Sequence, residues 1–421
     1  MPVKNLLMPK TSKNRRSSLP RRVFWVVLAL ALLAAGTLPA AAAPPQSYES
    51  LRLITEALHE INQKYVWQKG EGEMMHGALR GMMNSLDPDS SFLTPKEYQE
   101  FQAGEKALPA EAGMELVFKD HLLTVVSVLD EGPAFRAGIR PGDHILKIDG
   151  QTMRNITTQE GVRRFQGKPG TVLKLQVLRN GLVKPLDLTL TLEPLGPGRI
   201  TSQIFKDSYA YLRVPFFTDE TPGQLADAVK KLVHRQPPLR GLILDLRNNA
   251  RGTMEQAVRS ASVLLGDREI VSTRGRQGDG ERSYRGKERE LALKPPLPLV
   301  VLIDQGTARG AEIMAGALRY HSRGQLLGAK SFGLCGITNV LPLNDGSALM
   351  MTVAHCYTPG GQKITGKGLE PDVAGQKPEG EKPPTPSSRT LPPDQDPWVL
   401  QAVELLKTGK TALSVKSSPA P

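Results

Sequence analysis

With 421 residues the chain is longer than one typical domain, so two or three domains are expected. A composition of 39% hydrophobic and 23% charged residues is typical of a globular protein. Seven basic side chains and no acidic one lie in the first 43 residues, and subtracting them lowers the net charge from +12 to +5. Because no basic stripe with interleaved aromatic residues occurs elsewhere, we do not expect nucleic-acid binding.

Residues 1–43 predict an export signal. A basic stretch precedes the apolar run Val23–Ala35, and the small residues Ala40–Ala43 follow it. This order is typical of a signal peptide that is cleaved after the small residues. The alternative is an uncleaved membrane tether, although the run is shorter than the about 20 residues that a spanning helix needs. We therefore predict a periplasmic or cell-envelope location.

Two helices are predicted in an N-terminal helical segment, residues 44–104. Apolar residues recur at helical spacing over Tyr48–Tyr65. A second helix is expected over Gly72–Leu86, ending at Asp87-Pro88.

Turn residues at fixed spacing mark residues 105–194 as a separate domain. Short alternating strands, Leu122–Val128 and Leu173–Leu178, lie on either side of the run GPAFRAGIRPGDHILKIDG, residues 132–150. The glycines and prolines of this run fix its turns. The run resembles PDZ domains, which bind a peptide C-terminus as an added strand.

The PDZ resemblance implies a peptide-binding loop at residues 111–116. The residues implied in binding are Gly113, Met114, Glu115 and Leu116. PDZ domains of this type usually have two glycines in the loop, whereas only Gly113 remains here, and Glu111 adds an anion where the ligand carboxylate would lie. A peptide-binding domain and a simple spacer both remain open.

Strands and helices alternate over residues 195–373, which predicts an α/β domain. The expected strands are Tyr209–Val214, Gly241–Leu246 and Val300–Ile303, and the expected helices are Thr221–His234, Thr253–Leu265 and Ala311–Tyr320.

Residues 301–338 resemble the active-site segment of the C-terminal processing peptidases, which use a serine–lysine dyad. In that family one turn has the motif G-S-A-S-A-S-E-I and a second has T-F-G-K-G-x-V-Q. Aligned without a gap, the serine corresponds to Arg309, the lysine to Leu334 and the glutamine that orients the lysine to Thr338. Arginine has no hydroxyl and leucine accepts no proton, so the sequence predicts an inactive site.

A further departure lies at the turn that shapes the oxyanion hole in this family. The family motif D-L-R-x-N-x-G-G ends here in Arg251-Gly252, so one glycine has become arginine. An oxyanion hole needs accessible backbone N–H groups, and a side chain at this position is expected to crowd them.

A displaced dyad of Thr307 and Lys330 is the alternative that would restore hydrolysis. Thr307 lies two residues before the serine position and Lys330 four before the lysine position. A helix-capping threonine and a solvated lysine explain the same residues. The histidines show no metal-ligand spacing, so neither a metal nor a cofactor is expected.

The two cysteines, Cys335 and Cys356, lie on either side of a predicted β-hairpin. Asp345-Gly346 between two apolar runs is typical of a two-residue turn. That turn would place the cysteines directly opposite each other, within disulfide reach, whereas one bulge would break the register. Two buried free thiols are the alternative.

The chain is expected to close with a Pro-rich linker, residues 374–397, and a C-terminal helix with a disordered tail, residues 398–421. The resemblances together imply an α/β (α+β) core of the C-terminal processing peptidase type, with an inserted PDZ domain and the N-terminal helical segment. The expected function is non-hydrolytic binding of polypeptide C-termini or exported partner proteins, as an adaptor or scaffold. The alternative is an active serine-type endopeptidase that uses the displaced dyad.

Overall fold

The computed structural model describes residues 46–103, 109–120, 122–154, 156–205, 208–276, 281–287, 289, 297–376 and 391–408. The predicted signal peptide, most of the Pro-rich linker and the tail lie outside the described residues. The chain divides into two units, residues 1–71 and 72–421. None of the described helices combines the length and hydrophobicity that crossing a membrane requires.

Helix α2, Gln46–Lys64, is the described element of the first unit and corresponds to the predicted first helix. Helix α3, Glu71–Asn84, begins at the boundary and ends two residues earlier than predicted. A turn at Asp87 follows α3. Strand β1, Ser91–Leu93, and helix α4, Pro95–Gln102, come next and were not predicted. The Asp87 carboxylate accepts hydrogen bonds from the backbone N–H groups of Asp89 and Ser90, both at 2.9 Å.

The next elements form the PDZ fold. Its antiparallel sheet has the order β3-β4-β5-β8-β9, and β3 lies at the edge. Its larger strands are β3, Met114–Lys119; β4, Leu122–Val128; β5, His144–Ile148; β8, Val172–Leu178; and β9, Leu186–Thr191. The short helices α5, Pro133–Arg136, and α6, Thr158–Arg163, pack on this sheet around one apolar core. The remaining strands have two residues each: β2, Ala110–Glu111; β6, Gln151–Thr152; and β7, Gln166–Gly167.

A six-stranded sheet forms the α/β part, with the order β10-β11-β12-β15-β16-β19. Its strands are β10, Thr201–Phe205; β11, Tyr209–Arg213; β12, Gly241–Asp245; β15, Leu299–Ile303; β16, Gln325–Gly328; and β19, Val373–Ala374. Strand β10 pairs antiparallel with β11, and the remaining pairs are parallel.

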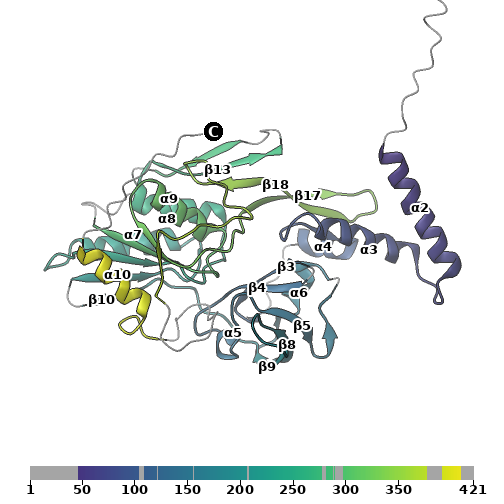
Figure 1. Ribbon diagram of the computed structural model, residues 1–421, viewed down its shortest axis with the longest axis horizontal. Helices are drawn as coiled ribbons and strands as arrows, with labels where there is room; N and C mark the ends of the chain where they lie inside the picture. Colours follow the sequence, from purple (N-terminus) through teal and green to yellow (C-terminus); the bar gives the residue numbers. More distant parts are fainter. Residues whose placement is uncertain are drawn as a thin grey trace, which may run out of the picture. The chain divides into compact units, whose positions relative to one another are not determined.

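Helices cover both faces of this sheet (Figure 1). One face packs on α7, Thr221–Val233; α8, Met254–Leu265; and α9, Gly310–Tyr320. The other packs on α10, Pro397–Thr408. Side chains of the central strands point alternately to the two faces of the sheet. Leu242 and Leu244 pack in the core beneath α7, α8 and α9, while Ile243 packs in the core beneath α10.

A second sheet carries the cysteine hairpin. It has the order β1-β18-β13-β14, with β17 paired to β18. Its remaining strands are β13, Glu269–Gly275; β14, Arg282–Arg285; β17, Gly336–Pro342; and β18, Ala348–Tyr357. The β13–β14 pair was not predicted.

The predicted two-residue turn of the hairpin is wrong. The backbone N–H of Leu343 donates to the carbonyl of Ser347, which leaves a three-residue loop with Gly346 at φ +83°. This shifts the pairing by one residue near the turn. A β-bulge between Ile337 and Thr338 shifts it back, so Gly336 pairs with His355 as the two-residue turn would require.

Candidate functional site

The residue at the serine position, Arg309, sits at a strained turn between β15 and α9. It has φ +52° and ψ −119°, a conformation that residues with a side chain rarely adopt. Its backbone N–H donates to the carbonyl oxygen of Leu334 at 2.9 Å, which joins this turn to the loop of the lysine position. The frame of a nucleophile turn is therefore present, while the hydroxyl is not.

The Arg309 side chain pairs with a carboxylate from the turn after α3. Its Nη2 lies 3.0 Å from Oδ1 of Asp89. Burial raises the pKa of Asp89, and the neighbouring guanidinium opposes that shift. Arg309 therefore contributes a cation paired with a carboxylate, and its side chain has no hydroxyl.

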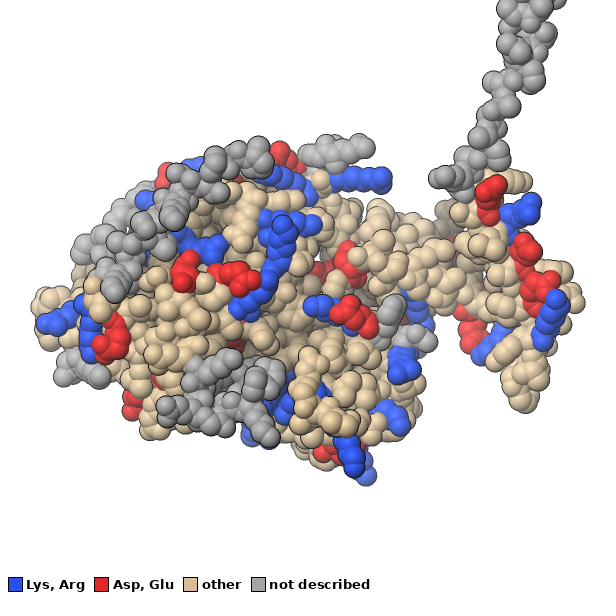
Figure 2. All heavy atoms as spheres, viewed as in Figure 1, with Lys and Arg blue, Asp and Glu red and all other residues tan. Residues whose placement is uncertain are grey.

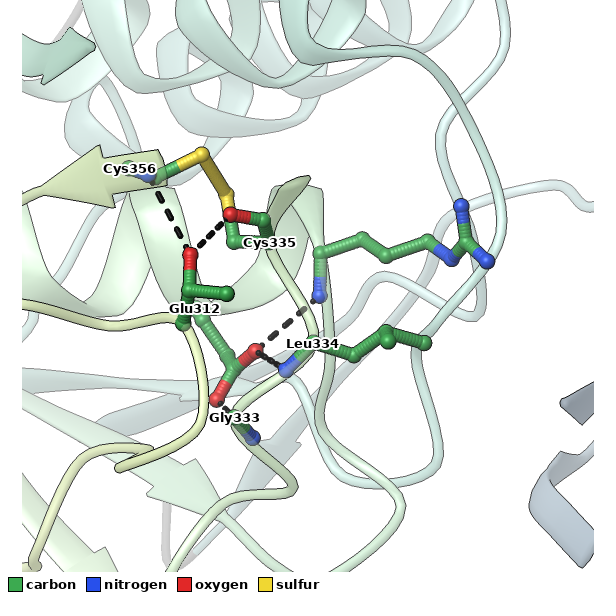
Figure 3. The surroundings of a disulfide bond; sticks show 7 residues. Glu312, Gly333, Leu334, Cys335 and Cys356 are labelled. Carbon is green, nitrogen blue, oxygen red and sulfur yellow. Dashed lines mark hydrogen bonds between the residues drawn. A yellow bond between two sulfur atoms is a disulfide. The ribbon is translucent and has the colours of Figure 1, made fainter. Parts of the chain in front are cut away.

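Glu312 holds the two turns of the site together (Figure 3). Its carboxylate accepts backbone N–H bonds from Gly333 at 2.7 Å, Leu334 at 3.0 Å and Arg309 at 3.2 Å, and a hydroxyl bond from Ser331. Complete burial raises the pKa of Glu312 to about 7, and these hydrogen bonds oppose the rise. Glu312 was not among the predicted site residues, although it aligns with the glutamate of the G-S-A-S-A-S-E-I motif.

Leu334, at the lysine position, belongs to an apolar cluster shared by two domains. The cluster contains Val117 and Val126 of the PDZ sheet together with Ala250, Ala308 and Leu334 of the α/β part, and all five are buried. At the position predicted to correspond to the lysine, Leu334 therefore packs hydrocarbon against the PDZ domain.

Thr338, predicted to correspond to the glutamine, lies on β17 opposite Thr352 and is exposed.

The outer face of strand β3 contacts the α/β part at two residues besides Val117. Glu115 accepts a hydrogen bond from Arg251, and the Lys119 ammonium lies over the ring of Phe332. The outer face of β3 thus packs over the turns that carry Arg251 and Leu334.

Arg251, in the predicted oxyanion turn, is bound to the loop of the PDZ domain that was predicted to bind peptide. Its Nη1 and Nη2 donate to the two carboxylate oxygens of Glu111 at 3.0 and 2.7 Å, and its Nε donates to Glu115 at 2.7 Å. Burial disfavours the charged form of Arg251 and so lowers its pKa. The hydrogen bonds and charges of Glu111 and Glu115 outweigh this effect, so the pKa of Arg251 is raised overall. Gly252 has φ +114°, and a Cβ there would lie 2.6 Å from Phe217, so this second glycine is still required.

The structure does not bring Thr307 and Lys330 together. Thr307 is buried, and its hydroxyl donates to the carbonyl of Leu246 at 3.0 Å. Lys330 has a side chain that is 55% exposed and pairs with Glu370 at 2.6 Å. The exposed Lys330 matches the alternative of a solvated lysine. The helix-capping role expected for Thr307 is wrong, because Arg309 is the N-cap of α9 and the Thr307 hydroxyl bonds Asp304 and Leu246 instead.

The predicted disulfide between Cys335 and Cys356 is present, with 5.6 Å between the Cα atoms (Figure 3). It joins the residue after Leu334 to strand β18 and so fixes the loop of the lysine position. Within the described part of the chain, no group of three or more His, Cys, Asp or Glu side chains is arranged to hold a metal.

Two cavities reach the turns of Arg309 and Leu334. One of about 220 Å³ lies between β3 and α6, and Arg251 and Arg309 line it from the α/β part. The other, of about 510 Å³, reaches Leu334 and includes Asp87, Phe332 and His355. The predicted loop residues Glu115 and Leu116 line the first, whereas Gly113 and Met114 line a smaller hollow of about 20 Å³ beside Arg251.

Charged side chains on the face shown in Figure 2 are mixed, with Lys and Arg lying beside Asp and Glu. Among the described residues, Arg319 pairs with Asp372 and Lys330 pairs with Glu370.

Comparison with known proteins identifies two family models along the chain. Peptidase family S41 matches residues 208–374, and the PDZ domain matches residues 111–190. A carboxy-terminal-processing protease of Bartonella bacilliformis is 33% identical over 338 residues, which is 80% of this chain and 77% of that protein. The carboxy-terminal processing protease CtpA of Bacillus subtilis is 30% identical over 365 residues, or 86% and 74% of the two chains. The solved photosystem II D1 C-terminal processing protease superposes with a TM-score of 0.64 at 27% identity, covering 76% of this chain and 86% of its own.

Proposed function

Because this chain belongs to the carboxy-terminal processing proteases, peptidase family S41 with a PDZ domain, we propose that it is a non-hydrolytic member. It binds polypeptide C-termini or exported partner proteins through its PDZ domain and the inherited cleft. It acts as an adaptor or scaffold and leaves the bound chain intact.

The observation that carries this proposal is the chemistry at the two dyad positions. Arg309 stands at the nucleophile turn paired with Asp89, and Leu334 is buried beneath Val117 and Val126. Covalent catalysis needs a hydroxyl and a base that accepts its proton, and neither position supplies one. In a comparable catalytic unit, loss of any member leaves only about 10³–10⁴-fold acceleration over water.

Peptide binding is supported by the edge position of β3 and the cavity beside it. An edge strand has unpaired backbone groups that an extended peptide can use, and helix α6 forms the other wall of the groove. The relatives named above are carboxy-terminal processing proteases, which supports polypeptide C-termini as the ligand class proposed for this chain.

Export is part of the proposal and rests on the basic, apolar and small residues of the first 43 positions. The disulfide Cys335–Cys356 supports it, because disulfides persist in oxidising compartments outside the cytoplasm.

A cleavage and binding assay tests the function. The purified chain is incubated with an unfolded polypeptide that has an apolar C-terminus, with Bacillus subtilis CtpA as the positive control, and products are analysed by mass spectrometry. We expect binding without cleavage. Cleavage by the unaltered chain would overturn the proposal, and its loss in Thr307→Ala would assign it to the displaced dyad.

A restoration experiment tests the reason for inactivity. The combined variant Arg309→Ser, Leu334→Lys, Thr338→Gln returns the dyad, and adding Arg251→Gly removes the side chain from the oxyanion turn. We expect measurable cleavage only in the four-residue variant, because an arginine side chain at position 251 is expected to crowd the oxyanion N–H groups in the three-residue variant.

A further inference from the structure

The groove between β3 and α6 of the PDZ domain opens onto Arg251 and Arg309 of the α/β part. The cavity of about 220 Å³ is lined by Glu115 and Leu116 of β3 and Val162 of α6, and also by Arg251 and Arg309 of the α/β part. A peptide in this groove would therefore contact guanidinium groups that lie outside the PDZ domain. Both groups stand at positions where this chain departs from the catalytic motifs of its family.

Arg251 already holds a carboxylate in the geometry that a peptide C-terminus would need. Both oxygens of Glu111 accept from its two Nη atoms, a bidentate pairing that matches the planar guanidinium to a planar carboxylate. Glu111 belongs to the loop that in PDZ domains holds the ligand's terminal carboxylate. The Glu111 side chain thus stands in for that carboxylate.

We propose that Arg251 is the carboxylate-binding residue of the peptide site and that Glu111 is an internal competitor for it. The inference rests on the proposed function, since it assumes that a polypeptide C-terminus enters the groove. On binding, the terminal carboxylate of the ligand replaces Glu111 on the two Nη atoms. The ligand class is then a polypeptide with a free α-carboxylate, as opposed to an internal or amidated segment.

The exchange conserves the number of hydrogen bonds that Arg251 makes. Its two Nη atoms bond the carboxylate of Glu111 before binding and that of the ligand after it, while Nε stays bonded to Glu115. The Glu111 side chain is 28% exposed and the Arg251 side chain 32%, so the released carboxylate can reach solvent without crossing a sealed core. Arg309 adds a second positive charge to the same cavity, and its buried Nε has no hydrogen-bond partner among the described residues.

Peptide binding by fluorescence anisotropy tests the exchange. The probes are an eight-residue peptide with an apolar C-terminal residue and an N-terminal fluorophore, prepared as the free acid and as the C-terminal amide. We expect the unaltered chain to bind the free acid roughly tenfold more tightly than the amide, because a bond between charged partners is lost in the amide. Arg251→Gln should abolish this preference, while Arg251→Lys should retain part of it.

Glu111→Gln provides a second variant with the opposite expected effect. Removing the competing carboxylate should tighten free-acid binding by roughly fivefold, about 1 kcal/mol, and leave amide binding unchanged. A tighter complex cannot result from misfolding, so this outcome supports the exchange even if Arg251→Gln lowers stability. The matched controls are Arg274→Gln and Glu281→Gln, which remove an exposed ion pair on β13 and beside β14 and should change neither affinity.

Three results decide between the ideas. Equal binding of acid and amide by the unaltered chain would overturn the role of Arg251 and leave the peptide-binding function intact. Unchanged or weaker acid binding by Glu111→Gln would reject Glu111 as competitor. No binding of either peptide to the unaltered chain would reject the proposed function, and the inference with it.

Discussion

The backbone N–H of Arg309 donates a hydrogen bond to the carbonyl oxygen of Leu334 at 2.9 Å. These residues occupy the serine and lysine positions of the family, and their main chains are still joined across the centre. Glu312 accepts the N–H groups of both residues and adds a second link. Two sets of backbone contacts therefore join the loops of Arg309 and Leu334, and the side chains of these two residues make contacts of their own.

Leu334 is predicted to stabilise the contact between the PDZ domain and the α/β part. Replacing it by alanine removes hydrocarbon from the buried cluster with Val117 and Val126, so the unfolding free energy should fall by about 2–4 kcal/mol. Guanidinium denaturation followed by circular dichroism measures this change. Leu341→Ala, at a side chain that is 38% exposed, is the control and should lower the unfolding free energy by less than about 1 kcal/mol. Equal losses in both variants would show that the cluster adds nothing specific.

The strained backbone of Arg309 and its ion pair with Asp89 should be separable by a double-mutant cycle. Arg309→Gly relieves a conformation that costs a residue with a side chain about 1–3 kcal/mol, but it leaves the Asp89 side chain, which is 11% exposed, without its partner. Adding Asp89→Asn to Arg309→Gly should therefore raise the unfolding free energy by about 1–2 kcal/mol. In the unaltered background the same Asp89→Asn change should lower it. An effect of equal sign and size in both backgrounds would mean that the pair is not coupled.

Local sequence patterns predicted the elements that carry the centre. Strand β15 and helix α9 differ from their predicted bounds by one residue at the start, since apolar periodicity and a turn glycine define both. The PDZ strand β4 was predicted over the residues it occupies, Leu122–Val128. The dyad positions could be located because they lie at fixed distances from these turns.

Contacts between distant segments could not be predicted in this way. Arg309 and its partner Asp89 are 220 positions apart, and Arg251 and Glu111 are 140 apart, so no local periodicity links them. Glu111 was recognised as an unusual anion in the loop, but its cation lay in another domain. The cysteine pairing was predicted although the turn was not, because the bulge at Ile337 offsets the three-residue loop.

The disulfide is predicted to stabilise the second sheet and the loop of Leu334. Cys335 and Cys356 are separated by 21 positions, and closing a loop of this size stabilises a fold by about 3 kcal/mol in chain-entropy models. Cys335→Ser with Cys356→Ser should lower the melting temperature, and a reducing agent should lower that of the unaltered chain by a similar amount. The reducing agent should have no effect on the double variant, which is the internal control. A melting temperature that is insensitive to reduction in the unaltered chain would contradict the prediction.

Glu312 should make stability depend on pH in a direction opposite to that of most carboxylates. Its pKa rises from 4.5 in the unfolded chain to about 7 in the fold, so between these values the folded protein holds a proton that the unfolded chain releases. The stabilisation from this proton is complete below about pH 4.5 and is lost as the pH rises through 7, with a total on the order of 3 kcal/mol. Glu312→Gln should remove this contribution from the slope of unfolding free energy against pH, measured between pH 5 and 8. Glu370→Gln, at a side chain that is 65% exposed, should leave the slope as it is. Equal slopes for the unaltered chain and Glu312→Gln would show that the buried carboxyl does not take up a proton in this range.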